Sequence, residues 1–208
     1  MRDELHDQRR DKIVAAARQV FLDKGFERAT INEAARLARV SSATVYIYFE
    51  TKDRLFEAVT AAALAPFEGV FAQVEGLAGA PEAVLARMAH AYFEFLTDPA
   101  VRGLYRIIIG EADRRPDLGE AAYGTAHNTL GAVLRRRLAG FDAEGVLKVP
   151  DPAIAARLFQ GMIEHATLVI PLLRGLATPP SHEAEPYCAE VVRAFLSAYG
   201  PTGEYSQA

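Results

Sequence analysis

Three helix-start signals stand close together in residues 30–56 and constrain the fold more than any other feature of the chain. Thr30, Ser41 and Thr51 can each cap a helix, because a hydroxyl oxygen accepts a hydrogen bond from an amide that the first helical turn leaves unpaired. Glu33 follows Thr30 at the spacing of a capping box, in which its carboxylate would accept from the Thr30 amide. The stretch therefore predicts two short helices joined by a tight turn, with a third helix starting at Thr51.

The first two of these helices have the pattern of a helix-turn-helix. A small apolar face on the first helix is formed by Ile31, Ala34, Ala35 and Ala38. Ala35 is small where two crossing helices would touch, and Val40 and Val45 would point back at it. The second helix runs from Ser41 to Tyr48 and is short enough to lie in a major groove of DNA.

A longer helix is expected ahead of this motif, over residues 7–24. Its apolar stripe consists of Ile13, Ala17, Val20 and Phe21. Gly25 stands where a left-handed C-cap would end the helix. The cations near its start, Arg9, Arg10 and Lys12, suit either a solvated helix face or contact with phosphates.

A wider set of positions extends this pattern at fixed spacing: Ile13, Ala16, Ala17, Val20, Phe21, Gly25, Phe26, Thr30, Ile31, Val40, Ser41, Thr44, Val45, Tyr46, Tyr48, Phe49, Lys52, Asp53 and Leu55. With these residues, the segment 13–56 resembles the DNA-binding domain of the TetR family of transcriptional regulators. Arg39 and Ala43 depart from the family pattern, which usually has glycine at both positions. A left-handed backbone at Arg39 would cost roughly 1 kcal/mol relative to glycine, and its side chain would reach either DNA or solvent.

The resemblance implies a set of DNA-contacting residues, namely Thr30, Ser41, Ser42, Ala43, Thr44, Tyr46, Tyr48 and Lys52. Hydroxyls and amides at helix N-termini can bind phosphate oxygens, and the Ala43 methyl could touch a thymine methyl. Tyr46 and Tyr48 could each donate to a phosphate or pack in the core, while Lys52 is similar to the family's phosphate-binding lysine. The expected recognition helix contains no Arg, Asn or Gln, so it predicts no particular base preference.

The charge distribution agrees with one end of the chain facing phosphates. The 208 residues have a formal net charge of −4, which by itself argues against a nucleic-acid binder. However, residues 1–56 carry 11 Lys and Arg against 9 Asp and Glu, whereas residues 57–208 carry 12 against 18. The mildly basic N-terminal quarter is therefore the part suited to DNA.

Several classes of protein are disfavoured by what the sequence contains. The single cysteine, Cys188, excludes an internal disulfide framework and fits a reducing cytoplasm. The charged segment from Met1 to Lys12 predicts no secretory leader, and no apolar run approaches the roughly 18 residues of a membrane span. The five histidines are scattered and the glycines form no phosphate-binding loop. We therefore expect a cytoplasmic protein that is not an enzyme, with no metal, no cofactor and no membrane partner.

The rest of the chain is predicted to be helical, so the expected fold class is all-α. The expected runs are 52–75, 81–97, 99–113, 116–139, 152–175 and 186–199. Asp98 and Asp151 are ready caps, each followed by a proline that a first helical turn tolerates. Pro66 predicts a kink near residues 62–66 of the first run. Gly140 is expected to end the run 116–139. The expected domains are a helix-turn-helix DNA-binding domain at 1–56, a larger helical ligand-binding and dimerisation domain at 57–200, and a flexible tail at 201–208.

The last two expected helices each carry a wide apolar face, which together predict a dimer interface. Its members are Leu158, Met162, Ile163, Val169, Ile170, Val191, Val192, Phe195, Leu196 and Tyr199. Pairing both helices with their copies would give a four-helix interface with two-fold symmetry. The same symmetry would set two recognition helices about 34–36 Å apart, as half-sites one DNA turn apart require.

A ligand domain is expected between the DNA-binding helices and this interface. The segments Tyr105–Leu118 and Asp151–Phe159 resemble the AefR-like C-terminal subgroup of the family. The candidate ligand contacts are Tyr92, Phe95, Tyr105, Glu111, His127, Asn128, Phe159, Met162 and His165. Such aromatic residues can line an apolar cavity, but at helical spacing they can equally form a packed core.

The sequence therefore predicts a homodimeric repressor that binds a palindromic operator in double-stranded DNA. A small apolar or amphipathic effector would release it by favouring a conformer whose recognition helices no longer fit. The alternative is a helical small-molecule-binding protein whose N-terminal unit makes protein contacts. Salt dependence separates the two, because binding through several phosphates weakens steeply with ionic strength.

Overall fold

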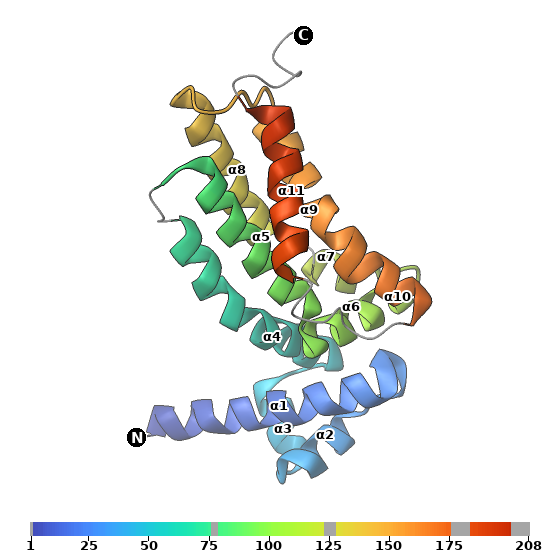
Figure 1. Ribbon diagram of the computed structural model, residues 1–208. Helices are drawn as coiled ribbons and strands as arrows, with labels where there is room; N and C mark the ends of the chain where they lie inside the picture. Colours follow the sequence, from blue (N-terminus) through green and yellow to red (C-terminus); the bar gives the residue numbers. More distant parts are fainter. Residues whose placement is uncertain (1, 76–78, 123–127, 176–183, 201–208) are drawn as a thin grey trace. The chain divides into compact units, whose positions relative to one another are not determined.

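The computed structural model describes residues 2–75, 79–122, 128–175 and 184–200, and over these ranges it is helical with no strand (Figure 1). The helices are α1 (Arg2–Arg28), α2 (Ile31–Ala38), α3 (Ser42–Tyr48), α4 (Lys52–Glu75), α5 (Pro81–Thr97), α6 (Pro99–Glu111), α7 (Pro116–Ala122), α8 (Asn128–Ala143), α9 (Pro152–Glu164), α10 (Ile170–Arg174) and α11 (Ala184–Tyr199). A π-helical turn, His165–Val169, joins α9 to α10. The expected all-α class is confirmed, and none of the helices described is long and apolar enough to cross a bilayer.

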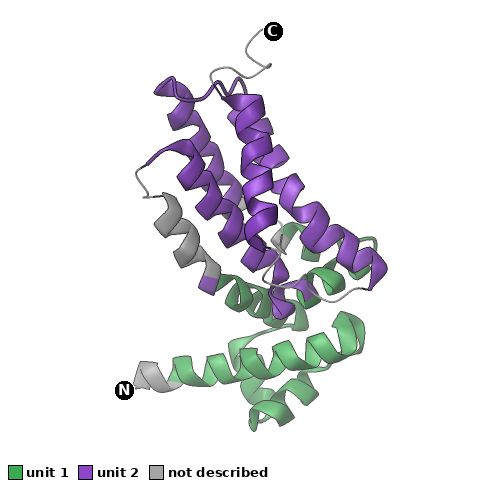
Figure 2. Cartoon of the chain, in the orientation of Figure 1, with its two compact units in different colours: residues 1–65, 103–125 green, residues 66–102, 126–208 purple. Residues whose placement is uncertain are grey.

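The chain forms two compact units (Figure 2). The first contains residues 1–65 and 103–125, and the second contains residues 66–102 and 126–208. The first unit therefore holds the helix-turn-helix together with most of α6 and with α7, from much later in the chain. The functional boundary expected after Phe56 stays a prediction, and the expected tail at 201–208 lies outside the described residues.

One apolar core holds the first unit together. It takes buried residues from α1, α2, α3 and α4, and also Leu104 of α6 and Leu118 of α7. Within it the Phe56 ring stands nearly perpendicular to the Phe21 and Phe26 rings, with ring centroids 5.0 and 5.3 Å apart. Such edge-to-face pairs stabilise a core beyond the area they bury. The helix-turn-helix thus packs against side chains from both segments of the unit, residues 1–65 and residues 103–125.

The three expected N-caps are confirmed, each by an amide that donates to a side-chain oxygen three residues before it: Glu33 to Thr30 at 3.3 Å, Thr44 to Ser41 at 3.1 Å and Arg54 to Thr51 at 3.1 Å. The capping box differs from the prediction. The Glu33 carboxylate accepts from the Thr30 hydroxyl at 3.0 Å and from the Lys24 ammonium, rather than from the Thr30 amide. The nearby cation explains the change, because a charged donor outcompetes a neutral amide.

The first helix is longer than expected. It runs from Arg2 to Arg28, and Gly25 lies inside it with non-helical angles of φ 77° and ψ 174°. That region of backbone space is essentially open to glycine alone, so the need for glycine is confirmed. The first stretch of helical angles therefore ends at Gly25, as expected, and a further short helical stretch reaches Arg28 after this kink.

The second unit shows two further differences from the expected helices. Helix α8 continues past Gly140 to Ala143, and the chain turns instead at Gly145, where φ is +70°. The run expected at 152–175 is interrupted by the π-turn. Pro171 lacks an amide and cannot continue an α-helical ladder, and the Thr167 hydroxyl donates to the Ile163 carbonyl at 2.7 Å. Pro66, by contrast, lies inside α4 without ending it, and its kink stays a prediction.

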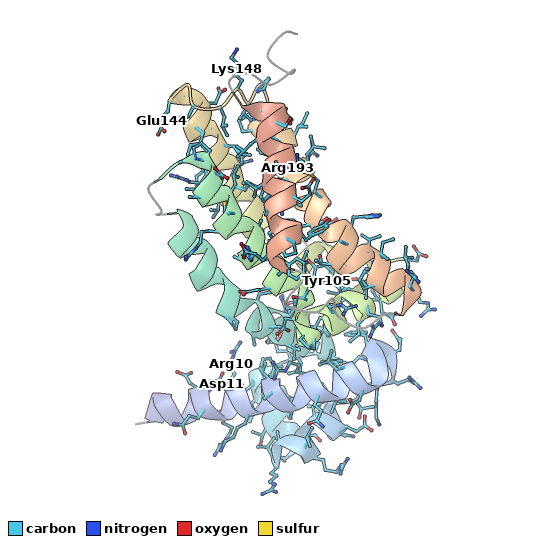
Figure 3. All side chains as sticks on the ribbon, in the orientation of Figure 1. Arg10, Asp11, Tyr105, Glu144, Lys148 and Arg193 are labelled. Carbon is cyan, nitrogen blue, oxygen red and sulfur yellow. The ribbon has the colours of Figure 1, made fainter. Side chains whose placement is uncertain are left out.

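In the second unit α5 packs against α9 and α11, and α8 packs against α9. The Phe159 and Phe195 rings meet edge to face, 5.2 Å apart. The loop before α9, which includes Glu144 and Lys148 (Figure 3), is tied to the end of α11 by a backbone bond. There the Lys148 amide donates to the Tyr199 carbonyl at 2.8 Å. The C-terminal helix is therefore part of this unit's core.

Candidate nucleic-acid interface

Helix α3 turns one face to solvent and the other into the core of the first unit. Val45 is fully buried, whereas Ala43, Tyr46 and Ile47 are exposed, Tyr46 by 52% and Ile47 by 78%. Their spacing of three and four residues places these side chains on one helical face. Ile47 was missed by the sequence reasoning, although its spacing from Ala43 could have indicated it. An exposed isoleucine beside a tyrosine makes this face suited to contact with a partner.

Hydrogen bonds within the protein fix the start of α3. The Ser42 hydroxyl donates to the Asn32 side-chain carbonyl at 2.6 Å, and the Ser41 and Thr44 hydroxyls lie 2.8 Å apart. The hydroxyls of Ser41, Ser42 and Thr44, which were predicted to contact DNA, thus lie close together. Each of them already has a hydrogen-bond partner within the protein. Asn32 of α2, which was not predicted, ties the two helices of the motif to each other. These contacts orient the exposed face of α3.

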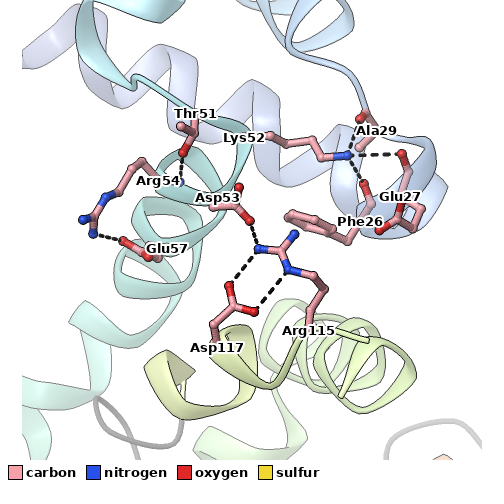
Figure 4. A network of polar contacts seen from close by, with 10 residues as sticks. All are labelled: Phe26, Glu27, Ala29, Thr51, Lys52, Asp53, Arg54, Glu57, Arg115 and Asp117. Carbon is pink, nitrogen blue, oxygen red and sulfur yellow. Dashed lines mark hydrogen bonds and ion pairs between the residues drawn. The ribbon is translucent and has the colours of Figure 1, made fainter. Parts of the chain in front are cut away.

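The Lys52 ammonium closes the end of α1 (Figure 4). It donates to three backbone carbonyls, those of Phe26 at 3.0 Å, Glu27 at 3.2 Å and Ala29 at 3.4 Å. It also lies 4.5 Å from the centroid of the Phe26 ring. An ammonium has three N–H donors, and all three are engaged here. The observed role of Lys52 is therefore structural, and its contact with phosphate stays a prediction.

The two tyrosines of α3 have different surroundings. Tyr46 is exposed, whereas Tyr48 is half-buried with its ring 4.5 Å from the His6 ring and 6.3 Å from the Phe49 ring. Tyr48 therefore packs against other rings, whereas Tyr46 lies outside the core, and a phosphate contact by either tyrosine stays a prediction. Thr30, the remaining candidate on this surface, is exposed at the N-cap of α2.

An ion-pair cluster holds the first turn of α4 (Figure 4). The Arg115 guanidinium donates to Asp53, and it also donates to Asp117 at 2.7 and 3.1 Å. The hydrogen bonds from Arg115 lower the pKa of Asp117. The bonds to Asp117 and Asp53 in turn raise the pKa of Arg115. Arg115 also lies 5.2 Å from the Phe26 ring centroid. The start of α4 and the segment before α7 are thus joined by charge as well as by the core.

Two family descriptions match the sequence. "Bacterial regulatory proteins, tetR family" matches residues 13–59, and "AefR-like transcriptional repressor, C-terminal domain" matches residues 83–201, more than half of the chain. The chain belongs to the TetR family of transcriptional regulators. Both resemblances inferred from the sequence are confirmed.

Solved structures of transcriptional regulators are similar over nearly the whole chain. A regulator of this family from Mesorhizobium loti MAFF303099 is 28% identical, with 93% of this chain and 98% of that chain covered and a TM-score of 0.78. The flavonoid-responsive regulator FrrA is 26% identical, with 95% and 100% covered and a TM-score of 0.75. Among curated relatives, the HTH-type transcriptional repressor BepR of Brucella suis biovar 1 (strain 1330) is 36% identical over 64 residues. The match spans 31% of this chain and 31% of BepR, so it covers less than a third of that relative.

The ligand contacts expected of this TetR-family protein fall in both units. Tyr105 and Glu111 belong to the first unit. In the second unit Tyr92, Phe95 and Phe159 are buried, Met162 is half-buried and His165 is exposed. His127 and the side chain of Asn128 lie outside the described residues. Tyr92 donates its hydroxyl to Glu164 and stacks on Phe95 with centroids 6.1 Å apart. These aromatic side chains pack as a core, and their role in ligand binding stays a prediction.

Gln160 is a buried polar residue that the sequence reasoning missed. It is only 2% exposed, and among the described residues its side-chain amide nitrogen has no hydrogen-bond partner. Its carbonyl oxygen lies 3.2 Å from where a side chain on Gly131 would begin, so the glycine makes room for it. Amides are buried without a partner only rarely, and such cases need an explanation.

The surface expected to pair two TetR-family chains is only partly exposed. Leu158 and Val169 are exposed, and Met162, Ile170 and Leu196 are half-buried. The remaining members are interior residues of this chain: Ile163, Val191, Val192, Phe195 and Tyr199. Packing within this chain covers these five side chains, for example where α11 packs on α5, and their place on an intersubunit surface stays a prediction. Ile154 and Leu173, exposed by 46% and 78%, extend the exposed row and were not predicted.

Neither a metal site nor a reactive thiol is evident where side chains are placed. No three His, Cys, Asp or Glu side chains in the described ranges are grouped to hold a metal ion. Burial raises the pKa of the Cys188 thiol to about 12, so this cysteine stays protonated near neutral pH.

Proposed function

We propose that this TetR-family protein is a repressor that binds a palindromic operator in double-stranded DNA as a homodimer, in the cytoplasm. A small apolar or amphipathic effector releases it. The proposal rests on the exposed face of α3, which carries Ala43, Tyr46 and Ile47, while Val45 of the same helix is buried. The Ser41 cap fixes the start of α3, and the Ser42–Asn32 bond ties this helix to α2, whose own start is capped by Thr30. A helix with such a face fits a major groove.

The exposed side chains favour thymine-containing sequence. The Ala43 methyl and the Ile47 side chain can make apolar contacts with thymine methyl groups. The Tyr46 hydroxyl can donate to a phosphate, which positions the helix without reading bases. Because α3 carries no Arg, Asn or Gln, bidentate hydrogen bonds to guanine or adenine are not part of this proposal.

The dimer uses the row of exposed apolar residues along α9, the π-turn and α10. Its members are Ile154, Leu158, Val169 and Leu173, with Met162 and Ile170 half-buried beside them. A two-fold axis brings the same row of each subunit together, as a self-complementary patch requires. Exposed apolar side chains in one row are typical of an interaction surface.

The effector is an apolar or amphipathic molecule that carries an oxygen acceptor. The unpaired amide nitrogen of Gln160 supports this, because a buried donor gains most from an acceptor that reaches it. The flavonoid-responsive name of FrrA suggests a flavonoid as the first probe. Release requires that the probe bind the DNA-free conformer more tightly than the DNA-bound one.

Selection of bound fragments from the source genome tests the proposal. Fragments retained by the protein should share an inverted repeat, and their binding should weaken steeply between about 50 and 200 mM salt. A flavonoid should then lower affinity for the selected fragment. If no fragment is retained above background, the helical small-molecule-binding alternative holds and the DNA proposal is wrong.

A further inference from the structure

A basic groove runs between α1 and the turn that joins α2 to α3. Its volume is about 940 Å³. Its polar lining consists of Gln8, Arg9, Lys12 and Gln19 from α1, Arg39 from the turn and Thr44 from α3. Thr44 directly follows the exposed Ala43, so one end of the groove reaches the start of the recognition helix. No carboxylate is among the residues that line it.

The groove cations differ from several other cations of the first unit, which form ion pairs within the protein. Lys24 pairs with Glu33, Arg54 with Glu57 and Arg115 with Asp53. Even Arg10, the neighbour of Arg9 on α1 (Figure 3), lies over the Phe49 ring at 5.5 Å. In the described part of the chain, the side chains of Arg9, Lys12 and Arg39 have neither an ion pair nor a hydrogen bond. Three unpaired charges around one concave surface attract an anion.

The backbone of Arg39 is strained. Its backbone is left-handed, at φ 56° and ψ 44°, and no other non-glycine residue in the described ranges has a positive φ. Glycine adopts this conformation freely, whereas a residue with a side chain is strained there. The strain therefore comes with an exposed, unpaired guanidinium beside the recognition helix. Strained residues of this kind often serve a function rather than stability.

We propose that this groove holds a stretch of DNA phosphate backbone beside the base pairs that α3 reaches, with Arg39 as a direct phosphate contact. The inference rests on the proposed function and adds a second contact surface to it. A guanidinium can bind two phosphate oxygens at once, and the amides of Gln8 and Gln19 can donate to others. Such contacts fix the position of the protein on DNA without reading its sequence.

The test compares variants of Arg39 in the full-length protein, using a labelled genomic fragment that the wild type retains. Arg39→Gly removes both the charge and the strain, Arg39→Gln removes only the charge, and Arg39→Lys keeps the charge. Arg106→Gln is the matched control, because Arg106 is an exposed arginine of the same unit that does not line the groove. Affinity is measured between about 50 and 200 mM salt, and thermal unfolding is followed in parallel.

Arg39→Gly and Arg39→Gln should each lower the slope of log affinity against log salt by about one for each half-site. Both should weaken operator and unrelated DNA by the same factor. Arg39→Gly should also melt about 2 to 4 °C higher than the wild type, since it relieves the left-handed strain. Arg39→Gln should show no such gain, and Arg39→Lys and Arg106→Gln should keep the wild-type slope.

Two outcomes would overturn the inference, and they are distinguishable. If the wild type binds DNA while Arg39→Gly and Arg39→Gln keep its affinity and slope, the groove is not a phosphate site although the proposed function stands. If the wild type binds no DNA at all, the proposed function fails and this inference fails with it.

Discussion

Arg115 donates a hydrogen bond to Asp53 across 62 residues of sequence (Figure 4). Asp53 is the second residue of α4, next to Lys52, whose ammonium holds the carbonyls at the end of α1. Leu104 and Leu118 add apolar contacts to the same core. Most of α6 and α7 therefore belong structurally with the helix-turn-helix, and Arg115 is their polar connection to it.

Arg115→Gln should loosen the segment 103–122. The variant loses charge-assisted bonds to both Asp53 and Asp117, so amide hydrogen exchange in α6 and α7 should become faster and the melting temperature should fall. Arg114→Gln is the matched control, because the exposed Arg114 forms its ion pair with Glu111, three residues before it, and makes no contact with α4 that the described residues show. Equal exchange in the two variants, measured by mass spectrometry, would contradict this prediction.

Glu33→Gln should destabilise the protein in a way that depends on pH. Hydrogen bonds from Lys24 and Thr30 lower the pKa of Glu33 below its ordinary value of 4.5. A lowered carboxylate pKa stabilises the fold at pH values above 4.5, and that stabilisation is lost as pH falls through the folded-state pKa. The urea midpoint of the wild type should thus exceed that of the variant at pH 7, and the two should converge below pH 4.5. A difference that stays constant with pH would argue against the charged pair.

Ile47→Ala should weaken operator binding without unfolding the protein. The side chain is 78% exposed, so its loss leaves the core unchanged. Losing an apolar contact with a thymine methyl should reduce affinity by about 1 kcal/mol, roughly fivefold. The salt slope should stay at the wild-type value, because no phosphate contact is removed. A gel-shift titration at several salt concentrations measures both quantities, and unchanged affinity would remove Ile47 from the interface.

Leu158→Glu should give folded monomers. Leu158 is 50% exposed in the apolar row of α9, so a charge there is tolerated in one chain but not between two copies. Phe195→Asp, by contrast, should unfold the second unit, because Phe195 is only 2% exposed and packs on Phe159. Light scattering with circular dichroism distinguishes the two results. A Leu158→Glu variant of dimer mass would place the interface elsewhere.

Gln160→Met should stabilise the protein by about 1 kcal/mol. It replaces a buried amide whose nitrogen has no partner by an apolar side chain of similar size. Urea denaturation measures the gain. If the amide serves the effector, the same variant should respond less to a flavonoid. Lower stability would show that the amide nitrogen is satisfied in solution, for example by a bound water.

Interactions between near neighbours in the chain were predictable from the sequence. The caps at Thr30, Ser41 and Thr51 depend on amides only three residues away, and the left-handed position of Arg39 depends on a turn of fixed length. These contacts form whenever the local backbone is helical, so residue type and spacing are enough to indicate them. The sequence by itself therefore determined the all-α class and the helix-turn-helix.

Only the tertiary structure decided which groups meet across long separations. Lys52 reaches carbonyls 23 to 26 residues earlier, and Arg115 reaches Asp53. The same packing buries Phe195 and leaves Leu158 exposed, although both lie on apolar helical faces. A periodic pattern shows that a face is apolar but not which surface covers it, because that choice depends on how the other helices pack. For this reason the recognition helix could be located from the sequence, while the anchoring of α4 and the exposed apolar row could not.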